Sequence, residues 1–489
     1  MTPNNEFAAQ LAHDIADRGE ALAAQPAQHP QGLQAILDTL QPLQFPALAG
    51  KKSIKDVTNK EMLVLAVREL LKIVEAAGAG LTAQNGLSFV YNGRYWQEIS
   101  REEMQAFLTA AAGRLGVDDI TAEYFETQDK LYKQFLATAR LMPKRRDRGT
   151  ILINFPNGTL EISQAGRWKL REHRRADFLK YELPYSYDAA ATACPLFTAY
   201  LNKVQPDTTA QAVLAEFVGN ALAPELQLQK ALVLNGPGSN GKSVFCAIVR
   251  EMLGGINNTT NYSMTSLTTE KFVRAGLEDK LLNICDEGPV KMDNEVFKTL
   301  VAGEPIKVER KNQDPYIMTH YAKIMFNCNL LPRDIEQSEG FYRRFLIIPF
   351  TTKIQDSEKD PELAAKIIAQ ELPAVFNWVL AGLRRLLKAK AFTECESAQA
   401  ALETYRKESN SVLMFIEEYN LQPGTGSPAD RETLKDLYNA YKFYCQSSGY
   451  YAMTKGNFNK QMQAQGYAGG RDSKGMWLAC KGFADADIL

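Results

Sequence analysis

The chain has 489 residues, of which 45% are hydrophobic, and its 56 Lys and Arg residues nearly balance its 57 Asp and Glu residues. This composition is typical of a folded soluble protein, and it excludes disordered, collagen-like and simple fibrous chains. The formal net charge of -1 gives no general attraction to nucleic acid, so such binding would require local clusters of Lys and Arg.

Cysteines and apolar runs give no sign of an oxidising or membrane environment. The seven cysteines are scattered, form no CxxC pair and have only four histidines beside them, so we expect reduced thiols and no zinc site. The N-terminus lacks a basic region followed by a long apolar run, and no stretch approaches 18 uninterrupted apolar residues. We therefore expect a cytoplasmic protein without a membrane segment.

The first two predicted regions differ in texture. Residues 1–80 are rich in Ala, Gln and Leu and predict a helical segment, with one clear helical pattern from about Asn59 to Ala77. Residues 81–207 contain short aromatic and β-branched runs, which predict an α/β domain. We expect its strands within residues 87–99, 151–162 and 177–187, with turns at the pairs Asn92-Gly93 and Asn157-Gly158.

A basic tract runs through this α/β domain and carries a net charge of +6. Its ten cations are Lys144, Arg145, Arg146, Arg148, Arg167, Lys169, Arg171, Arg174, Arg175 and Lys180, against the acids Asp147, Glu161, Glu172 and Asp177. A solvated surface and a nucleic-acid-binding groove are both compatible with such a tract, and the sequence leaves this choice open.

The strongest motif is a phosphate-binding loop of the GxxxxGK[ST] type, within residues 208–400. Its members are Gly236, Pro237, Gly238, Ser239, Asn240, Gly241, Lys242 and Ser243. The loop follows an apolar strand and opens a helix, whose N-terminus and backbone N–H groups favour phosphate oxygens. In this pattern Lys242 contacts the β- and γ-phosphates of ATP, and the Ser243 hydroxyl binds Mg²⁺.

Hydrolysis also needs carboxylates near the metal. An apolar strand over residues 281–285 ends in Asp286 and Glu287. Asp286 can hold the Mg²⁺ shell while Glu287 polarises the attacking water. The alternative is a strand that merely ends at a polar turn.

A β-hairpin is predicted from two alternating segments, 306–310 and 316–318, on either side of a polar turn. Arg310 and Lys311 lie near its expected tip, and with Lys307 they are candidates for binding DNA phosphates. A solvated edge hairpin is the alternative.

Two further positions suit phosphoryl transfer. Asn329 ends an apolar strand and can bind the γ-phosphate or orient the lytic water. Arg343 and Arg344 precede another apolar strand, and either can act as an arginine finger from a neighbouring subunit. We favour Arg344, although either arginine could instead pair with a local carboxylate.

The C-terminal part is helical and then forms a ribbon. Residues 361–392 predict two helices, the second starting at Pro373. Residues 401–489 predict a helix around Leu434 to Cys445, a second helix capped by Thr454, and a hairpin, which is the order of a winged helix. Winged helices bind DNA or proteins, and this region leaves both open.

In this order, the motifs between Gly236 and Phe350 resemble the motor of a superfamily 3 helicase. The chain is most similar to phage and plasmid primase-helicases and their poxvirus-type relatives, from about Leu87 to its end. The resemblance implies an α/β fold with an AAA+ type P-loop NTPase core, an N-terminal α/β domain and a C-terminal winged helix. The expected domains are residues 1–80, 81–207, 208–400 and 401–489.

The family also implies a function. We expect an ATP-dependent replicative DNA helicase of a phage, plasmid or prophage in the cytoplasm of a bacterial host. It would be a homo-oligomer, a hexameric ring that uses ATP and Mg²⁺ and moves 3′ to 5′ on single-stranded and forked DNA. In this resemblance Asp286 and Glu287 match the acidic pair and Asn329 the sensor asparagine.

One departure concerns the primase. No strand-borne DxD pair with a following His site precedes the motor, so we expect a helicase without primase activity and a separate primase or polymerase chain as partner. Two alternative functions stay open: an AAA+ ATPase that remodels proteins, and an origin-binding scaffold that uses ATP only to assemble.

Overall fold

The structure is a computed structural model, and it describes residues 31–140, 149–286, 292–311, 313–332, 336, 338–473 and 475–483. These residues form two compact units. The first contains the described residues up to 140, together with 154–160 and 170–182. The second contains 149–153, 161–169 and the described residues from 183 onwards.

The first unit packs helices against a small antiparallel sheet. Its strands β1 (Gly80–Gln84), β2 (Leu87–Tyr91) and β3 (Trp96–Ile99) pair in that order. Its helices are α2 (Gln31–Thr39), α3 (Phe45–Leu48), α4 (Asn59–Ala76), α5 (Arg101–Arg114), α6 (Asp119–Glu123) and α7 (Phe125–Thr138). A capping box of Thr58 and Glu61 begins α4, which confirms the predicted helix. One hydrophobic core joins these elements, so the described residues before 80 share it with those that follow.

A second small sheet contains β4 (Thr150–Phe155), β5 (Gly158–Ser163) and β6 (Trp168–Arg171), in that order. The predicted turn at Asn157-Gly158 joins β4 to β5. Gly158 has a φ of +145°, and a Cβ atom there would lie 2.6 Å from the carbonyl oxygen of Arg171. Glycine is therefore required at this turn for both conformation and space.

The strand predicted within residues 177–187 is wrong. The chain there leaves a short 3-10 helix (Arg175–Asp177), and Phe178 adopts the left-handed conformation with a φ of 50°. A left-handed residue interrupts an extended segment, and no strand is assigned over 177–187. Leu179 instead accepts a single bond from the backbone N–H of Trp96 through its carbonyl oxygen, at 2.7 Å.

The second unit is built on a five-stranded parallel sheet with the order β13-β7-β12-β9-β8. The strands are β7 (Ala231–Asn235), β8 (Thr259–Thr260), β9 (Leu282–Cys285), β12 (Lys323–Cys328) and β13 (Phe345–Pro349). Ala231 to Leu234 are fully buried, because helices cover both faces of the sheet. The predicted parallel sheet flanked by helices is therefore confirmed.

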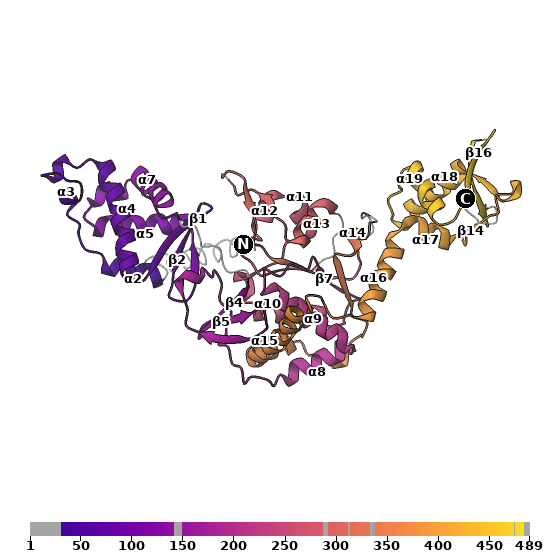
Figure 1. Cartoon of the computed structure of the whole chain (residues 1–489), viewed down its shortest axis with the longest axis horizontal. Helices are drawn as coiled ribbons and strands as arrows, with labels where there is room; N and C mark the ends of the chain where they lie inside the picture. Colours follow the sequence, from indigo (N-terminus) through magenta and orange to yellow (C-terminus); the bar gives the residue numbers. More distant parts are fainter. Residues whose placement is uncertain are drawn as a thin grey trace, which may run out of the picture. The chain divides into compact units, whose positions relative to one another are not determined.

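Helices lie on both sides of this sheet (Figure 1). On one side are α9 (Thr208–Ala221), α10 (Lys242–Met252) and α15 (Leu363–Ala389), with α8 (Pro195–Val204) next to α15. On the other side are α11 (Met264–Thr269) and α13 (Asn294–Ala302). The remaining helices of this region are α12 (Lys271–Ala275), α14 (Glu339–Tyr342) and α16 (Glu396–Ser409).

The sequence predicted that Pro373 starts a second helix. This prediction is wrong, because α15 runs through Pro373 without a break. Proline removes one backbone hydrogen bond from a helix interior. Buried side chains on both sides of the proline, among them Ile367, Val375 and Val379, anchor α15 in the core and offset this loss.

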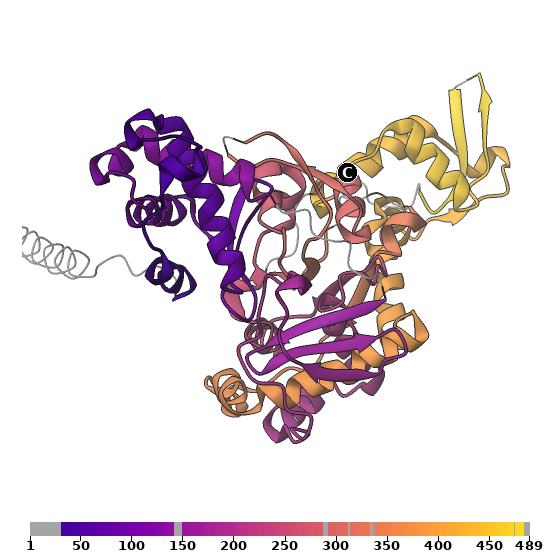
Figure 2. The same ribbon diagram turned by 60° about the vertical axis from the view of Figure 1, so that its left-hand side comes forward.

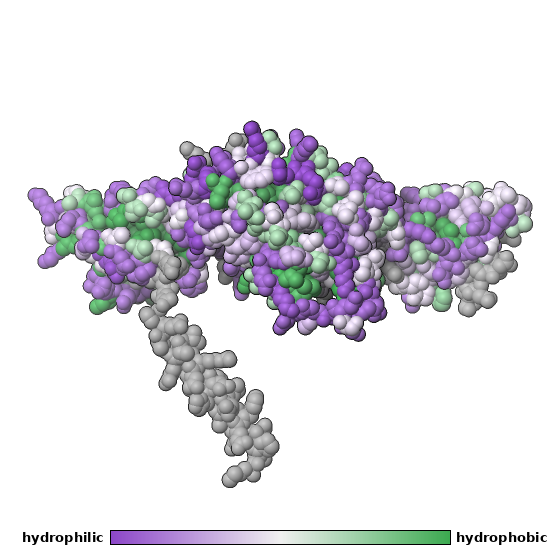
Figure 3. All heavy atoms as spheres, turned by 90° about the horizontal axis from the view of Figure 1, so that it is seen from below, coloured by the Kyte–Doolittle hydropathy of each residue, from purple (hydrophilic) through white to green (hydrophobic). Residues whose placement is uncertain are grey.

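By length and composition, α15 is also the one described helix that could cross a membrane. Its apolar residues are accounted for by packing against α9, α10 and α8. On the molecular face in Figure 3, hydrophilic residues surround smaller hydrophobic areas.

Two hairpins complete the second unit. β10 (Ile306–Val308) and β11 (Tyr316–Met318) pair antiparallel, which confirms the first predicted hairpin. The C-terminal part contains α17 (Ser411–Glu418), β14 (Gln422–Pro423), β15 (Arg431–Thr433), α18 (Leu434–Ser448), α19 (Lys455–Ala464), β16 (Gly469–Asp472) and β17 (Gly475–Lys481). The predicted Thr454 cap of α19 and the β16–β17 ribbon are both present, and the ribbon is clear in Figure 2.

All seven cysteines are free thiols, as predicted, and six of them are buried. Burial raises the pKa of Cys246 to about 12 and that of Cys328 to about 11. These thiols therefore stay protonated at neutral pH.

The packing of α9 against α15 predicts an effect of Gly382. A Cβ atom at Gly382 would lie 2.5 Å from the backbone carbon of Ala215, so Gly382→Ala should lower the free energy of unfolding by about 1–3 kcal/mol. Gly456 lies in α19 with open space around it, and Gly456→Ala should leave stability unchanged or raise it by up to about 1 kcal/mol. Denaturant unfolding measures both variants. Equal stability of the Gly382→Ala variant and the wild type would contradict this close helix contact.

Candidate functional site

The predicted phosphate loop lies between β7 and α10, so its strand-loop-helix context is confirmed. Gly236 has a φ of +156°, and a Cβ atom there would clash with the carbonyl oxygen of Phe350. Gly241 has a φ of +85°, and a Cβ atom there would lie 2.6 Å from Val204. Both glycines are therefore required by the backbone path of the loop.

Lys242 is held by the loop itself. It is buried, and its Nζ atom donates to the carbonyl oxygen of Gly236 at 2.6 Å and that of Pro237 at 3.1 Å. Nζ also donates to the Oδ1 atoms of Asn240 at 2.9 Å and Asn329 at 3.3 Å. Burial lowers the pKa of Lys242 from its usual range. A phosphate would offer this ammonium group anionic acceptors in place of neutral ones.

Asn240 fixes the loop to the end of β13. Its Nδ2 atom donates to the carbonyl oxygen of Phe350 at 2.7 Å, while its Oδ1 atom accepts from Lys242. The neighbouring residue is tied to the same segment, because the backbone N–H of Ile354 donates to the carbonyl oxygen of Ser239 at 2.8 Å. The loop is therefore attached to the segment after β13, the strand that pairs with β7, as well as to β7 itself.

Asp286 lies at the carboxyl end of β9, as predicted, and its side chain is about half exposed. Arg250 of α10 approaches it, with Nη2 3.6 Å from Oδ2 of Asp286. Glu287, the predicted partner of Asp286, lies outside the described residues.

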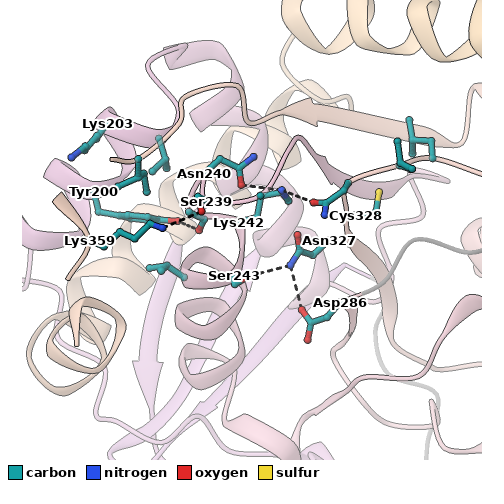
Figure 4. Close-up of a pocket in the computed structure, with 18 of the residues that line it drawn as sticks. Tyr200, Lys203, Ser239, Asn240, Lys242, Ser243, Asp286, Asn327, Cys328 and Lys359 are labelled. Atoms are coloured by element: carbon teal, nitrogen blue, oxygen red, sulfur yellow. Dashed lines mark hydrogen bonds between the residues drawn. The ribbon is translucent and has the colours of Figure 1, made fainter. Parts of the chain in front are cut away.

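Asn327 within β12 and Asn329 just after it both approach the loop, and the sequence singled out only Asn329. Asn329 follows the last strand residue, Cys328, and its Oδ1 atom accepts from Lys242, whereas Asn327 lies within the strand. The Nδ2 atom of Asn327 lies 3.5 Å from Oγ of Ser243 and 3.5 Å from Oδ1 of Asp286. Figure 4 shows the amide of Asn327 between these two groups. The period of two along the strand was the available signal for this residue.

These groups line a cavity of about 1220 Å³. Lys242, Ser243 and Asp286 lie at one end, and Tyr200, Lys203 and Lys359 lie on the other side of the loop (Figure 4). The Tyr200 hydroxyl donates to the carbonyl oxygen of Gly241 at 2.8 Å. The cavity thus combines the predicted phosphate-binding residues with a mixed polar and apolar lining, and a nucleoside triphosphate site requires both.

The donor set fits Mg²⁺. Ser243 and Asp286 supply hydroxyl and carboxylate oxygens, which are hard ligands. Within the described residues no group of three or more His, Cys, Asp or Glu side chains is placed to hold a metal by itself.

Arg343 and Arg344 lie at the opposite edge of the sheet from the loop. Both precede β13, whose first residue Phe345 pairs with Ala231, the first residue of β7. Arg344 donates through Nη1 to the carbonyl oxygen of Gly340 and through Nε to that of Lys298, the latter at 3.3 Å. Arg343 is exposed.

The three predicted DNA-binding residues of the hairpin differ in exposure and in their side-chain contacts. Lys307 and Lys311 are exposed. Arg310 forms an ion pair with Glu278, and its guanidinium lies 4.9 Å from the ring centroid of Tyr316. The Tyr316 hydroxyl donates to the same Glu278 carboxylate at 2.6 Å. Arg310 thus ties the hairpin to the residues before β9.

Some cations of the predicted basic tract contact acidic or aromatic side chains within the first unit. Arg171 pairs with Asp177 at 2.8 Å, and the Lys180 ammonium lies 4.5 Å from the ring centroid of Phe89. Lys144, Arg145, Arg146 and Arg148 of the tract lie outside the described residues. The nucleic-acid groove predicted from this tract stays a prediction.

The anchoring role of Asn240 predicts a loss of stability on its removal. Asn240→Ala deletes both hydrogen bonds of a buried side chain, and we expect the free energy of unfolding to fall by about 1–3 kcal/mol in denaturant titrations. Asn240→Asp is the matched variant, since it can still accept from Lys242 but cannot donate to Phe350. Wild-type stability in both variants would show that the loop is held in some other way.

Comparisons with known proteins match three parts of the chain to family models. Residues 75–206 match the model described as "D5 N terminal like". Residues 234–344 match a family of unknown function, DUF5906, and residues 407–466 match the model described as "Poxvirus D5 protein-like".

Two viral proteins are among the curated relatives. "Putative helicase L207/L206" of Acanthamoeba polyphaga mimivirus is 24% identical over 242 residues, which is 47% of this chain and 25% of that protein. "Putative helicase 121R" of Invertebrate iridescent virus 3 is 25% identical over 236 residues, 44% of this chain and 24% of that protein. The match therefore spans about a quarter of the length of these relatives.

Among solved structures, the chain is similar to the C-terminal region of NrS-1. One such structure has a TM-score of 0.45 at 13% identity and covers 84% of this chain and 97% of that one. Another, an A form without ligand, has a TM-score of 0.44 at 15% identity and covers 72% of this chain and 78% of that one.

Proposed function

Because the chain belongs to the phage- and poxvirus-type D5 helicase family, we propose that it is an ATP-driven DNA helicase that works as a ring of identical subunits. The observation that carries this proposal is the meeting of Lys242, Ser243, Asp286 and Asn329 at one edge of a parallel sheet. This set provides a phosphate cradle, hard metal ligands and a polar amide, which are the parts that phosphoryl transfer requires.

In this proposal the residues divide the work of ATP hydrolysis. The loop backbone and Lys242 bind the phosphates, and Asn329 positions the end of the triphosphate or the attacking water. Ser243 and Asp286 hold Mg²⁺, which neutralises charge that develops on the phosphate oxygens. Glu287 would polarise the water as general base.

The two sheet edges support a pocket shared between subunits. Five residues of β13 separate Arg344 from the end of the strand next to the loop, a distance of roughly 15 Å. An arginine at the amino edge therefore cannot reach the phosphates of its own subunit, and an arginine finger from this edge would act on a neighbour. Arg343 is the better candidate than the Arg344 favoured from sequence, since the Arg344 guanidinium is already bound to two carbonyl oxygens. The Nζ atom of Lys230 donates to the carbonyl oxygen of Arg343 at 2.6 Å and adds a cation beside it.

The hairpin is the proposed grip on single-stranded DNA. Lys307 and Lys311 are exposed and available to phosphates, whereas Arg310 is engaged with Glu278. Changes in the pocket between subunits would move the hairpins along the strand, in the 3′ to 5′ direction expected for superfamily 3.

Further parts of the proposal concern architecture and context. The sheet and its loop support an AAA+ type core, and α17 to α19 with the strand order β15-β17-β16 support a C-terminal winged helix. We also propose a hexamer, a separate primase or polymerase as partner, and the cytoplasm of a bacterial host as location.

The test of the function is ATP hydrolysis measured with and without single-stranded DNA. We expect Mg²⁺-dependent hydrolysis that rises severalfold with DNA, because a DNA motor couples the two. Lys242→Ala should lower hydrolysis by about 100-fold or more, since it removes a cation at the transferring phosphate.

The outcomes also separate the rivals. Hydrolysis that is indifferent to DNA would favour a machine that remodels proteins. Full unwinding by Glu287→Gln, in a strand-displacement assay, would mean that hydrolysis is not the engine and would favour the scaffold.

The shared pocket predicts different roles for the two arginines. Arg343→Ala should reduce hydrolysis by about 1000-fold while nucleotide binding persists, because the finger acts on the transition state. Arg344→Ala should instead lower the stability of the second unit, since it removes two hydrogen bonds to backbone carbonyls.

Mixed assemblies check the same point. Doping wild-type protein with Lys242→Ala subunits should reduce hydrolysis more steeply than simple dilution. Strictly proportional loss, or a fully active monomer by mass measurement, would contradict the shared pocket.

A further inference from the structure

Two side chains to which the sequence analysis assigned no role approach Asp286. Asn327 of β12 approaches one carboxylate oxygen, with Nδ2 3.5 Å from Oδ1. Arg250 of α10 approaches the other, with Nη2 3.6 Å from Oδ2. Asp286 follows the last residue of β9 and is exposed, so its own strand does little to fix its rotamer.

Asn327 reaches Ser243 at the same time, with Nδ2 3.5 Å from Oγ. A carboxamide nitrogen carries two hydrogen atoms, so one group can donate to both oxygens at once. Each oxygen keeps a further lone pair for a cation. Asn327 is 7% exposed, which limits the other positions its amide can take.

Arg250 is placed by the same helix that carries Ser243. The two residues are seven apart, so their side chains leave α10 on the same face. The Nη2 atom of Arg250 is buried and makes no hydrogen bond to any residue that the structure describes. A buried, unpaired guanidinium nitrogen is costly, and the Asp286 carboxylate is the acceptor just beyond hydrogen-bond distance.

We propose that Asn327 and Arg250 are positioning residues that hold Ser243 and Asp286 at the spacing at which both can bind one divalent cation. This inference rests on the proposed nucleotide site. The amide of Asn327 bridges the side chains of Ser243 and Asp286, and the guanidinium of Arg250 holds the Oδ2 atom of Asp286. Neighbours of this kind orient metal ligands without touching the metal.

Nucleotide binding, without turnover, tests the proposal in the full-length chain. The probe is a fluorescent ADP analogue, titrated in EDTA and then at increasing Mg²⁺ concentration. For the wild type we expect Mg²⁺ to tighten binding. In Asn327→Leu, which keeps the number and branching of the side-chain heavy atoms but cannot donate, the Mg²⁺ midpoint should rise by about 10-fold while affinity in EDTA stays at the wild-type value.

A second pair of variants guards against misfolding at Asn327. Arg250→Met should raise the Mg²⁺ midpoint in the same direction, and Arg250→Lys should restore part of the loss because it keeps the charge. Asn327→Asp should lower the Mg²⁺ midpoint relative to Asn327→Leu, since it offers the cation a carboxylate in place of an apolar group.

Asn283 provides the matched control. It is a buried asparagine on β9 whose amide bonds to Thr260 and Tyr262, away from the pocket. Asn283→Ala should lower stability and leave the Mg²⁺ midpoint unchanged.

The results distinguish a failure of the proposed function from a failure of the positioning role of Asn327 and Arg250. A wild-type protein that binds no nucleotide overturns the proposed function and this inference together. A wild type that binds, with unchanged Mg²⁺ midpoints in both Asn327→Leu and Arg250→Met, overturns the inference alone. Equal losses in EDTA and in Mg²⁺ would make both residues purely structural and would also overturn it.

Discussion

The parallel pairing of β12 with both β7 and β9 is the constraint on which the proposed nucleotide pocket depends. Cys328 pairs with Asn235 at the end of β7, and Phe326 pairs with Cys285 at the end of β9. β12 thus lies between the loop strand and the acidic strand, and its last residues extend into the space between them. A shift of one residue in this register would turn Asn327 to the other face of the sheet.

The same parallel arrangement separates the two ends of the chemistry. In a parallel sheet all carboxyl ends share one edge, where ligands commonly bind. The cations that precede β13 lie at the other edge, beyond reach of the loop on the same subunit. The fold of a single chain therefore holds the predicted phosphate loop and these arginines at opposite edges of the sheet, and in the proposed ring a neighbouring subunit would bring the two together.

The sequence predicted the elements whose chemistry is local. The phosphate loop, the strands around it and the hairpin turn depend on residues that are neighbours in the chain, and these predictions agree with the structure. Asn327 and Arg250 could not be found in this way, because their significance comes from the meeting of β12, α10 and β9. The engagement of Arg310 by Glu278 likewise joins residues 32 positions apart.

The two errors in secondary structure have a common cause. Pro373 predicts a helix start, yet packing on both sides of it keeps α15 continuous. Residues 177–187 have the composition of a strand, but Phe178 turns the chain into a left-handed conformation. In both cases contacts with residues distant in the sequence accompany the departure from the local preference; for Phe178 they are the rings of Phe89 and Trp96.

The anchoring of the loop on β13 has a mechanical consequence. One end of this strand is tied to the phosphate cradle through Asn240 and through the bond from the N–H of Phe350 to the carbonyl of Asn235. The other end carries Arg343. The short strand β13 thus connects the proposed nucleotide pocket of one subunit to the arginine that would act on the pocket of its neighbour. In a closed ring, the β13 strands would connect each pocket to the next one. ATP hydrolysis in one subunit would then affect the pocket of its neighbour.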